Sequence, residues 1–111
     1  MRTMLALLLG LLAITAQAEP YFMDGNELYG RLLRQDPTAM TYILGVYDGV
    51  QITEYHVPSA DRILCTPPAV SRMELVDAVR GYLSAEPSIL SYPAAILVLR
   101  AFVWAFPCAK P

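Results

Sequence analysis

Apolar residues recur at the three-to-four-residue spacing of amphipathic α-helices in four stretches of the chain. The spacing predicts helices over residues 25 to about 35, 37 to about 55, 71 to about 86, and 93 to 106. Prolines separate these stretches, because the residue before a proline avoids the helical conformation. The pattern therefore predicts an all-α fold, a small bundle of four to five helices.

Three of these helices begin at recognisable capping sequences. Asp24 with Glu27, and Ser71 with Glu74, have the spacing of a capping box, in which each side chain accepts a hydrogen bond from an otherwise unpaired backbone N–H. Asp36 is the predicted N-cap of the second helix, because it directly precedes a proline that fits the first helical position. These caps fix the expected starts of the first three helices.

The apolar face of each amphipathic helix is expected to form the core. The last helix is apolar nearly all round, with Arg100 as its single charge, so we expect it at the centre of the bundle or partly covered by another subunit. The predicted inward-facing residues of the other helices are Leu28, Leu32 and Leu33; Met40, Ile43, Leu44, Tyr47, Val50 and Ile52; and Leu75, Val76, Val79, Tyr82 and Leu83.

Gly45 and Gly49 lie one turn apart inside the second predicted helix. Each glycine in a helix interior costs about 1 kcal/mol relative to alanine, so close packing of another backbone is the expected compensation. We expect a tight helix crossing within the chain at these glycines, with a contact in a dimer as the alternative.

The first 18 residues have the layout of a secretory signal peptide. Arg2 precedes an apolar run over residues 4–14, and the run ends in the small-x-small sequence Ala16-Gln17-Ala18. Cleavage after Ala18 would leave residues 19–111 as a single helical domain in the periplasm. The last apolar helix is too short for a membrane anchor and carries a charge near its middle, so we expect no membrane insertion of the mature chain.

The chain has two cysteines, Cys65 and Cys108. In an oxidising compartment such a pair usually forms a disulfide, and a loop of this length would contribute about 4 kcal/mol through the entropy of the unfolded chain. A domain of this size buries only about 60–65% of its unfolded surface, so a covalent staple or a partner subunit is the expected supplement. We therefore expect one disulfide and a homodimer.

Composition and motifs argue against several classes of function. Without the signal peptide, the chain has seven Lys and Arg and ten Asp and Glu, and this acidic balance disfavours nucleic-acid binding. The single histidine, His56, has no neighbouring pattern of metal ligands, and no nucleophile–base pair or phosphate-binding loop is visible. We expect no catalytic residues, no metal, no cofactor and no enzyme activity. His56 itself is expected at a helix C-terminus, with a partner contact as the alternative.

Several short motifs are spread along the predicted domain, and the more specific ones lie in its C-terminal half. The motifs are Asp24-Gly25-Asn26-Glu27-Leu28; Tyr42-Ile43-Leu44-Gly45-Val46-Tyr47-Asp48-Gly49; Cys65-Thr66-Pro67-Pro68 and Val70; Leu75-Val76, Val79, Tyr82-Leu83 and Glu86-Pro87; and Ala94-Ala95, Val98-Leu99 and Ala105-Phe106-Pro107-Cys108. Together they resemble the Rap1a/Tai family of periplasmic immunity proteins.

The resemblance implies a binding protein rather than an enzyme. Members of the family are small helical proteins, often dimeric, that block the active-site cleft of a peptidoglycan amidase effector of the type VI secretion system with a protruding loop. Many relatives carry a second cysteine pair between the first two helices, where this chain has Leu32 and Ala39 or Met40.

Two loops between predicted helices have the character of such an inhibitory element. One covers residues 56–64 and the other residues 84–92. The first is favoured, because a proline stiffens it and Cys65 tethers its end, which lowers the ordering cost of binding. Its candidate effector-binding residues are His56, Ser59, Asp61 and Arg62.

Two other functions fit an exported helical domain held by one disulfide. One is a periplasmic acid-stress chaperone, which would keep clients soluble at acidic pH and not at neutral pH. The other is an envelope protein-interaction module with a permanent partner, which would co-purify with that partner at all times.

Overall fold

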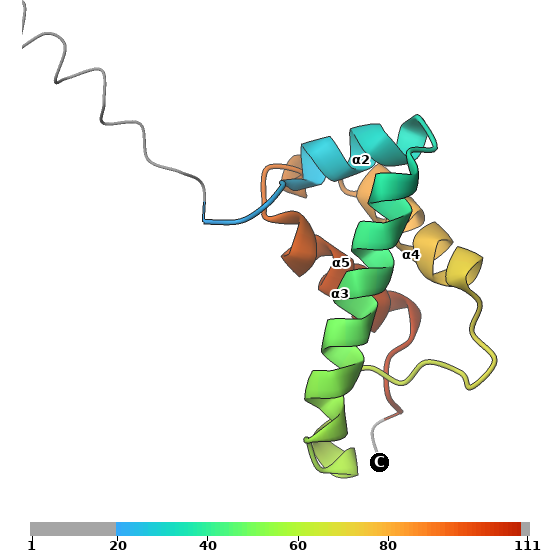
Figure 1. The fold of residues 1–111 in the computed structure, drawn as a ribbon. Coiled ribbons are helices and arrows are strands. Elements are labelled where there is room, and N and C mark those ends of the chain that lie inside the picture. Colours follow the sequence, from blue (N-terminus) through green and yellow to red (C-terminus); the bar gives the residue numbers. More distant parts are fainter. Residues whose placement is uncertain (1–19, 110–111) are drawn as a thin grey trace, which may run out of the picture.

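The computed structural model describes residues 20–109, and in this part of the chain it is all-α (Figure 1), which confirms the predicted fold class. The predicted signal peptide, residues 1–18, lies outside the described residues. The elements are α2 (Gly25–Leu33), α3 (Pro37–Tyr55), the 3₁₀ turn η1 (Ser59–Asp61), α4 (Arg72–Ala85), the 3₁₀ turn η2 (Pro87–Ile89) and α5 (Ala94–Ala105).

All three predicted N-caps form. The return bond from the glutamate differs from the prediction in both capping boxes, because neither the Glu27 nor the Glu74 carboxylate bonds the N-cap backbone. Glu27 instead accepts a hydrogen bond from Arg31 at 3.1 Å. The capping side-chain oxygens of Asp24, Asp36 and Ser71 accept from the backbone N–H groups of Glu27 (2.9 Å), Thr38 (2.9 Å) and Glu74 (3.1 Å).

The core gathers apolar side chains from α2, α3, α4 and α5, as the periodicity predicts. Two predictions are wrong, since Leu33 and Ile52 are 63% and 66% exposed. Leu33 ends α2, and Ile52 lies on the side of α3 that faces away from the buried Ile43. The buried apolar residues are Met23, Leu28, Leu32, Ala39, Ile43, Leu64, Leu75, Val76, Val79, Leu83, Ala94, Leu97, Val98, Ala101 and Phe102.

The helices α2 to α5 all contact one another, so their packing does not set α5 apart as the central helix that its composition predicts. α5 packs against α2, α3 and α4, and the ring of its Phe102 meets Tyr47 of α3 edge-on at 5.6 Å between centroids. The helix is not covered on every side, because Ile96 and Trp104 are exposed. Within the described chain, part of its apolar surface therefore faces solvent.

The predicted helix crossing at Gly45 and Gly49 is wrong. Both glycines are exposed, and a Cβ atom built on either would meet nothing within 4 Å. The reason is geometric, since these residues lie across the helix axis from Ile43, which is fully buried. Their alternative role, a contact in a dimer, stays a prediction.

The predicted disulfide is present between Cys65 and Cys108. It joins the segment before α4 to the segment after α5, where Leu64 and Pro107 form an isolated antiparallel bridge. The resemblance places the second cysteine pair of relatives at Leu32 and at Ala39 or Met40; here Leu32 and Ala39 are buried and Met40 packs against the core. Apolar packing thus connects α2 to α3 in this chain.

Candidate functional site

The C-terminal end of α3 and the turn that follows it project beyond the ends of the other helices (Figure 1). α3 has 19 residues, against 14 in α4 and 12 in α5. At 1.5 Å per residue, α3 is about 28 Å long and the other two are about 21 and 18 Å long. Its last turns therefore extend past the bundle. We call residues 55–63 the tip.

Hydrogen bonds within the tip give it a defined shape. Val57 N–H donates to the carbonyl oxygen of Glu54 at 3.0 Å and ends α3, and Asp61 N–H donates to the carbonyl oxygen of Pro58 at 2.9 Å within η1. At the base, Ile63 N–H donates to the carboxylate of Glu54 at 3.0 Å. This last bond joins α3 to the chain that returns from the tip toward the bundle, which we call the returning chain.

The four candidate effector-binding residues all lie on the tip and are all exposed. His56 caps the C-terminus of α3, as expected from the sequence, and its N–H donates to the carbonyl oxygen of Thr53 at 3.2 Å. Arg62 Nε donates to the carbonyl oxygen of Val57 at 3.3 Å, which holds the guanidinium close to the turn. The structure thus brings the predicted residues together on one projection.

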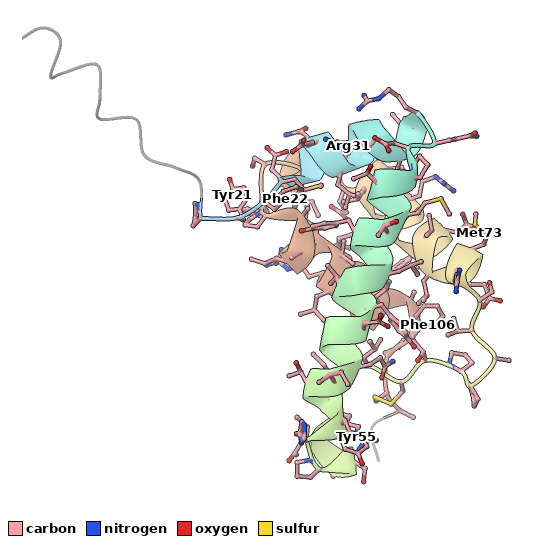
Figure 2. All side chains as sticks on the ribbon, in the orientation of Figure 1. Tyr21, Phe22, Arg31, Tyr55, Met73 and Phe106 are labelled. Carbon is pink, nitrogen blue, oxygen red and sulfur yellow. A yellow bond between two sulfur atoms is a disulfide. The ribbon has the colours of Figure 1, made fainter. Side chains whose placement is uncertain are left out.

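Apolar side chains of the tip region were missed by the sequence analysis. Tyr55 is 76% exposed and lies at the far end of α3 (Figure 2), and Ile63 and Ile52 are also exposed. The ring of Tyr55 meets that of His56 edge-on at 5.4 Å. The sequence held one signal for these residues, because a predicted 19-residue helix beside shorter ones must leave its last turns unpartnered.

Two hollows flank the returning chain. A cleft of about 300 Å³ lies between α3 and residues 62–66, and its lining includes Gln51, Glu54 and Tyr55. On the other side, an apolar groove of about 560 Å³ runs between α3 and α5. The groove is lined by Val46, Gly49, Val50, Thr53, Glu54, Ile63, Ala95, Ile96 and Leu99.

The second candidate loop, residues 84–92, is held against the body of the domain. The carbonyl oxygens of Leu90 and Tyr92 accept hydrogen bonds from Asn26 N–H (2.8 Å) and Gly25 N–H (3.0 Å). The start of α2 thus fixes the backbone of this loop from one side. The geometry therefore favours the tip over the second loop as a projecting element.

The described residues contain no group of three or more His, Cys, Asp or Glu that would hold a metal ion. None of the helices in residues 20–109 has the length and hydropathy that a membrane crossing requires. The tip carries exposed apolar side chains, Tyr55 and Ile63, together with exposed polar and charged ones, a mixture found in protein-binding surfaces.

A family model described as Rap1a immunity proteins matches residues 25–108. No curated protein and no solved structure matches the chain.

Proposed function

The chain belongs to the Rap1a immunity protein family, and on that premise we propose that it neutralises a peptidoglycan amidase effector of a type VI secretion system in the periplasm. Membership of a family of immunity proteins carries the proposal, because it implies an inhibitor rather than an enzyme. The disulfide supports an oxidising location, where such bonds persist. The mature protein is residues 19–111, after removal of the signal peptide.

The tip is the part that enters the active-site cleft of the amidase. An inhibitor needs a projecting element to reach catalytic residues in a cleft, and the tip extends past the bundle (Figure 1). Its exposed Tyr55 would form the apolar centre of the contact. Asp61 and Arg62 would surround that centre, where charges set orientation and association rate.

The protein acts as a homodimer through the apolar groove between α3 and α5. Ile96 lines this groove and is exposed, so a second copy of the chain would find an apolar surface there. Light scattering of the purified chain should give twice the monomer mass, and Ile96→Glu should reduce it to the monomer mass. A wild-type monomer at micromolar concentration would remove this part of the proposal.

The deciding experiment uses the hydrolase encoded next to this gene. Sent to the periplasm alone, the hydrolase should lyse the cells, and co-expression of this protein with its signal peptide should restore growth. The same protein without its signal peptide should not protect. Continued lysis in the presence of the exported protein would contradict the proposal. An acid-stress chaperone would instead keep an unrelated client soluble at acidic pH.

A further inference from the structure

The chain that returns from the tip is attached to the body of the protein by a covalent bond at one residue. Cys65 is bonded to Cys108, and Cys65 N–H donates to the carbonyl oxygen of Phe106 at 2.9 Å. Phe106 and Cys108 follow α5 directly. The disulfide therefore ties the chain that follows the tip, at Cys65, to the segment that follows α5.

Thr66, the residue after Cys65, is held to α3 by a cluster of polar side chains. The Thr66 hydroxyl lies 2.9 Å from the Tyr47 hydroxyl, and Gln51 Nε2 donates to both, at 3.1 Å to Thr66 and 2.8 Å to Tyr47. Both N–H bonds of the Gln51 amide are thus used, and all three groups are partly buried. We call the disulfide together with Tyr47, Gln51 and Thr66 the brace.

Side-chain packing contributes little to holding the tip. Between residues 56 and 66, Leu64 is the single buried side chain. A cleft also lies between α3 and residues 62–66, so little of this segment packs directly on the helix. The position of the tip therefore depends on discrete links: the Glu54 bond to Ile63, the backbone pairing of residues 64 and 65 with residues 106 and 107, and the brace.

We propose that the brace positions the tip for binding, and that the tip becomes competent to bind only when the Cys65–Cys108 bond has formed. The proposal rests on the proposed function for its consequence and on the geometry of the brace for its mechanism. With both thiols free, Leu64 and a few hydrogen bonds are left to hold the returning chain, and the tip samples other conformations.

The oxidation is a thiol–disulfide exchange with a protein dithiol–disulfide oxidant of the export compartment. One cysteine loses its proton, and its thiolate attacks the oxidant's disulfide; a mixed disulfide forms and one oxidant sulfur leaves as a thiolate. The second cysteine then attacks the mixed disulfide as a thiolate and releases the other oxidant sulfur. Two electrons and two protons pass to the oxidant, which leaves as a dithiol.

This dependence on the disulfide would make the protein's affinity for the amidase differ between the cytoplasm and the periplasm of a cell that makes both the amidase and this protein. In the reducing cytoplasm, the precursor would not capture an effector awaiting secretion. After export and oxidation, the same chain would present a rigid tip to any effector that enters the periplasm. Binding by a pre-ordered tip also avoids the entropy cost of ordering it during association.

The experiment compares the full mature chain before and after reduction with dithiothreitol. Amide hydrogen exchange of Ile63 and Asp61 reports the tip, and exchange of Val79 and Phe102 reports the core. We expect reduction to speed exchange in the tip at least tenfold and in the core less than threefold, and reoxidation to restore the oxidised values. Affinity for the neighbouring amidase should fall at least tenfold in parallel.

Two variants isolate the parts of the brace. Cys65→Ala/Cys108→Ala should show a mobile tip in both redox conditions, and it also reports any effect of dithiothreitol on the amidase itself. Tyr47→Phe removes one hydroxyl while the disulfide stays closed. It should speed exchange in the tip about threefold without changing core exchange, an effect that a merely structural role in the core would not produce.

Each outcome decides the proposal. Equal exchange in the tip and equal affinity before and after reduction would overturn it. Unfolding of the core on reduction would overturn it as well, because the disulfide would then hold the whole domain rather than the tip. An oxidised protein that binds no amidase would contradict the proposed function, while the exchange of Ile63 and Asp61 would still decide whether the brace positions the tip.

Discussion

Gly25 lies so close to Leu97 that a Cβ atom on the glycine would meet Leu97 Cδ1 at 2.5 Å. The same atom would lie 2.8 Å from the carbonyl oxygen of Leu90, and Gly25 N–H donates to the carbonyl oxygen of Tyr92 at 3.0 Å. The first residue of α2 is therefore the point where the N-terminal helix meets the chain leading into α5. Only a residue without a side chain fits there.

Gly25→Ala and Gly49→Ala should have opposite effects on stability. The first places a methyl group against a backbone oxygen that cannot move away cheaply, so we expect the free energy of unfolding to fall by about 1–3 kcal/mol. The second adds a methyl group in open space inside a helix and should raise it by up to about 1 kcal/mol. Urea denaturation of both variants measures the two free energies of unfolding. A lower free energy of unfolding for Gly49→Ala than for wild type would indicate that another group contacts α3 at this glycine.

Tyr55→Ala should weaken amidase binding with little effect on folding. The side chain is mostly exposed, so its removal should change the free energy of unfolding by less than about 0.5 kcal/mol. As an exposed aromatic at the centre of the proposed contact, it should cost about 2 kcal/mol of binding, roughly thirtyfold in affinity. Trp104→Ala is the matched control, because Trp104 is 72% exposed on α5. Equal affinities of the two variants in calorimetry would contradict the role of Tyr55.

Exchanging the charges at Asp61 and Arg62 tests the polar part of the tip. Asp61→Arg/Arg62→Glu keeps the net charge, so a loss of affinity would report the local pattern and not the overall field. We expect slower association with the amidase, and an effect that shrinks as salt is added. The control is Asp77→Arg/Arg80→Asp, which exchanges an exposed ion pair on α4. Unchanged association kinetics for the first variant would exclude these residues from the contact.

The turn between α2 and α3 should give the domain part of its acid sensitivity. Hydrogen bonds from Thr38 and then from Arg31 hold the pKa of Asp36 below its ordinary 3.8. A carboxyl whose pKa is lowered on folding contributes stability above its unfolded pKa, and this contribution is lost as the pH falls through the lowered value. Asp36→Asn should therefore lower Tm at neutral pH, and the difference from wild type should narrow as the pH falls below 3.8. Circular dichroism melts across this range check the trend, and a difference independent of pH would contradict it.

Local sequence patterns were sufficient to predict the helices. The bounds of α3 agree with the prediction, because Asp36 and Pro37 form its start and the turn before Pro58 follows its end. The three N-caps, the core face of α4 and the disulfide likewise follow from neighbouring residues or from the presence of two cysteines alone. These features depend on backbone hydrogen bonds and on chemistry that a short stretch of sequence carries by itself.

The candidate site was predicted in part. His56, Asp61 and Arg62 were identified because they lie in a loop with polar residues and a proline. Tyr55 and Ile63 were missed, because an apolar residue at a helix end or before a buried one looks like part of a core. Whether such a side chain is buried depends on how far the neighbouring helices extend, which periodicity does not report.

The sequence by itself determined the all-α architecture, the starts of its helices and the covalent link between Cys65 and Cys108. Only the tertiary structure decided which apolar faces meet a partner: Gly25 lies against α5, while Gly49 and Ile52 face solvent. The physical reason is that helix formation is set by local contacts along the chain, whereas burial is set by the lengths and crossings of helices distant in sequence. α3 is longer than the neighbouring helices, so its C-terminal end has no helix packed against it and forms the start of the tip.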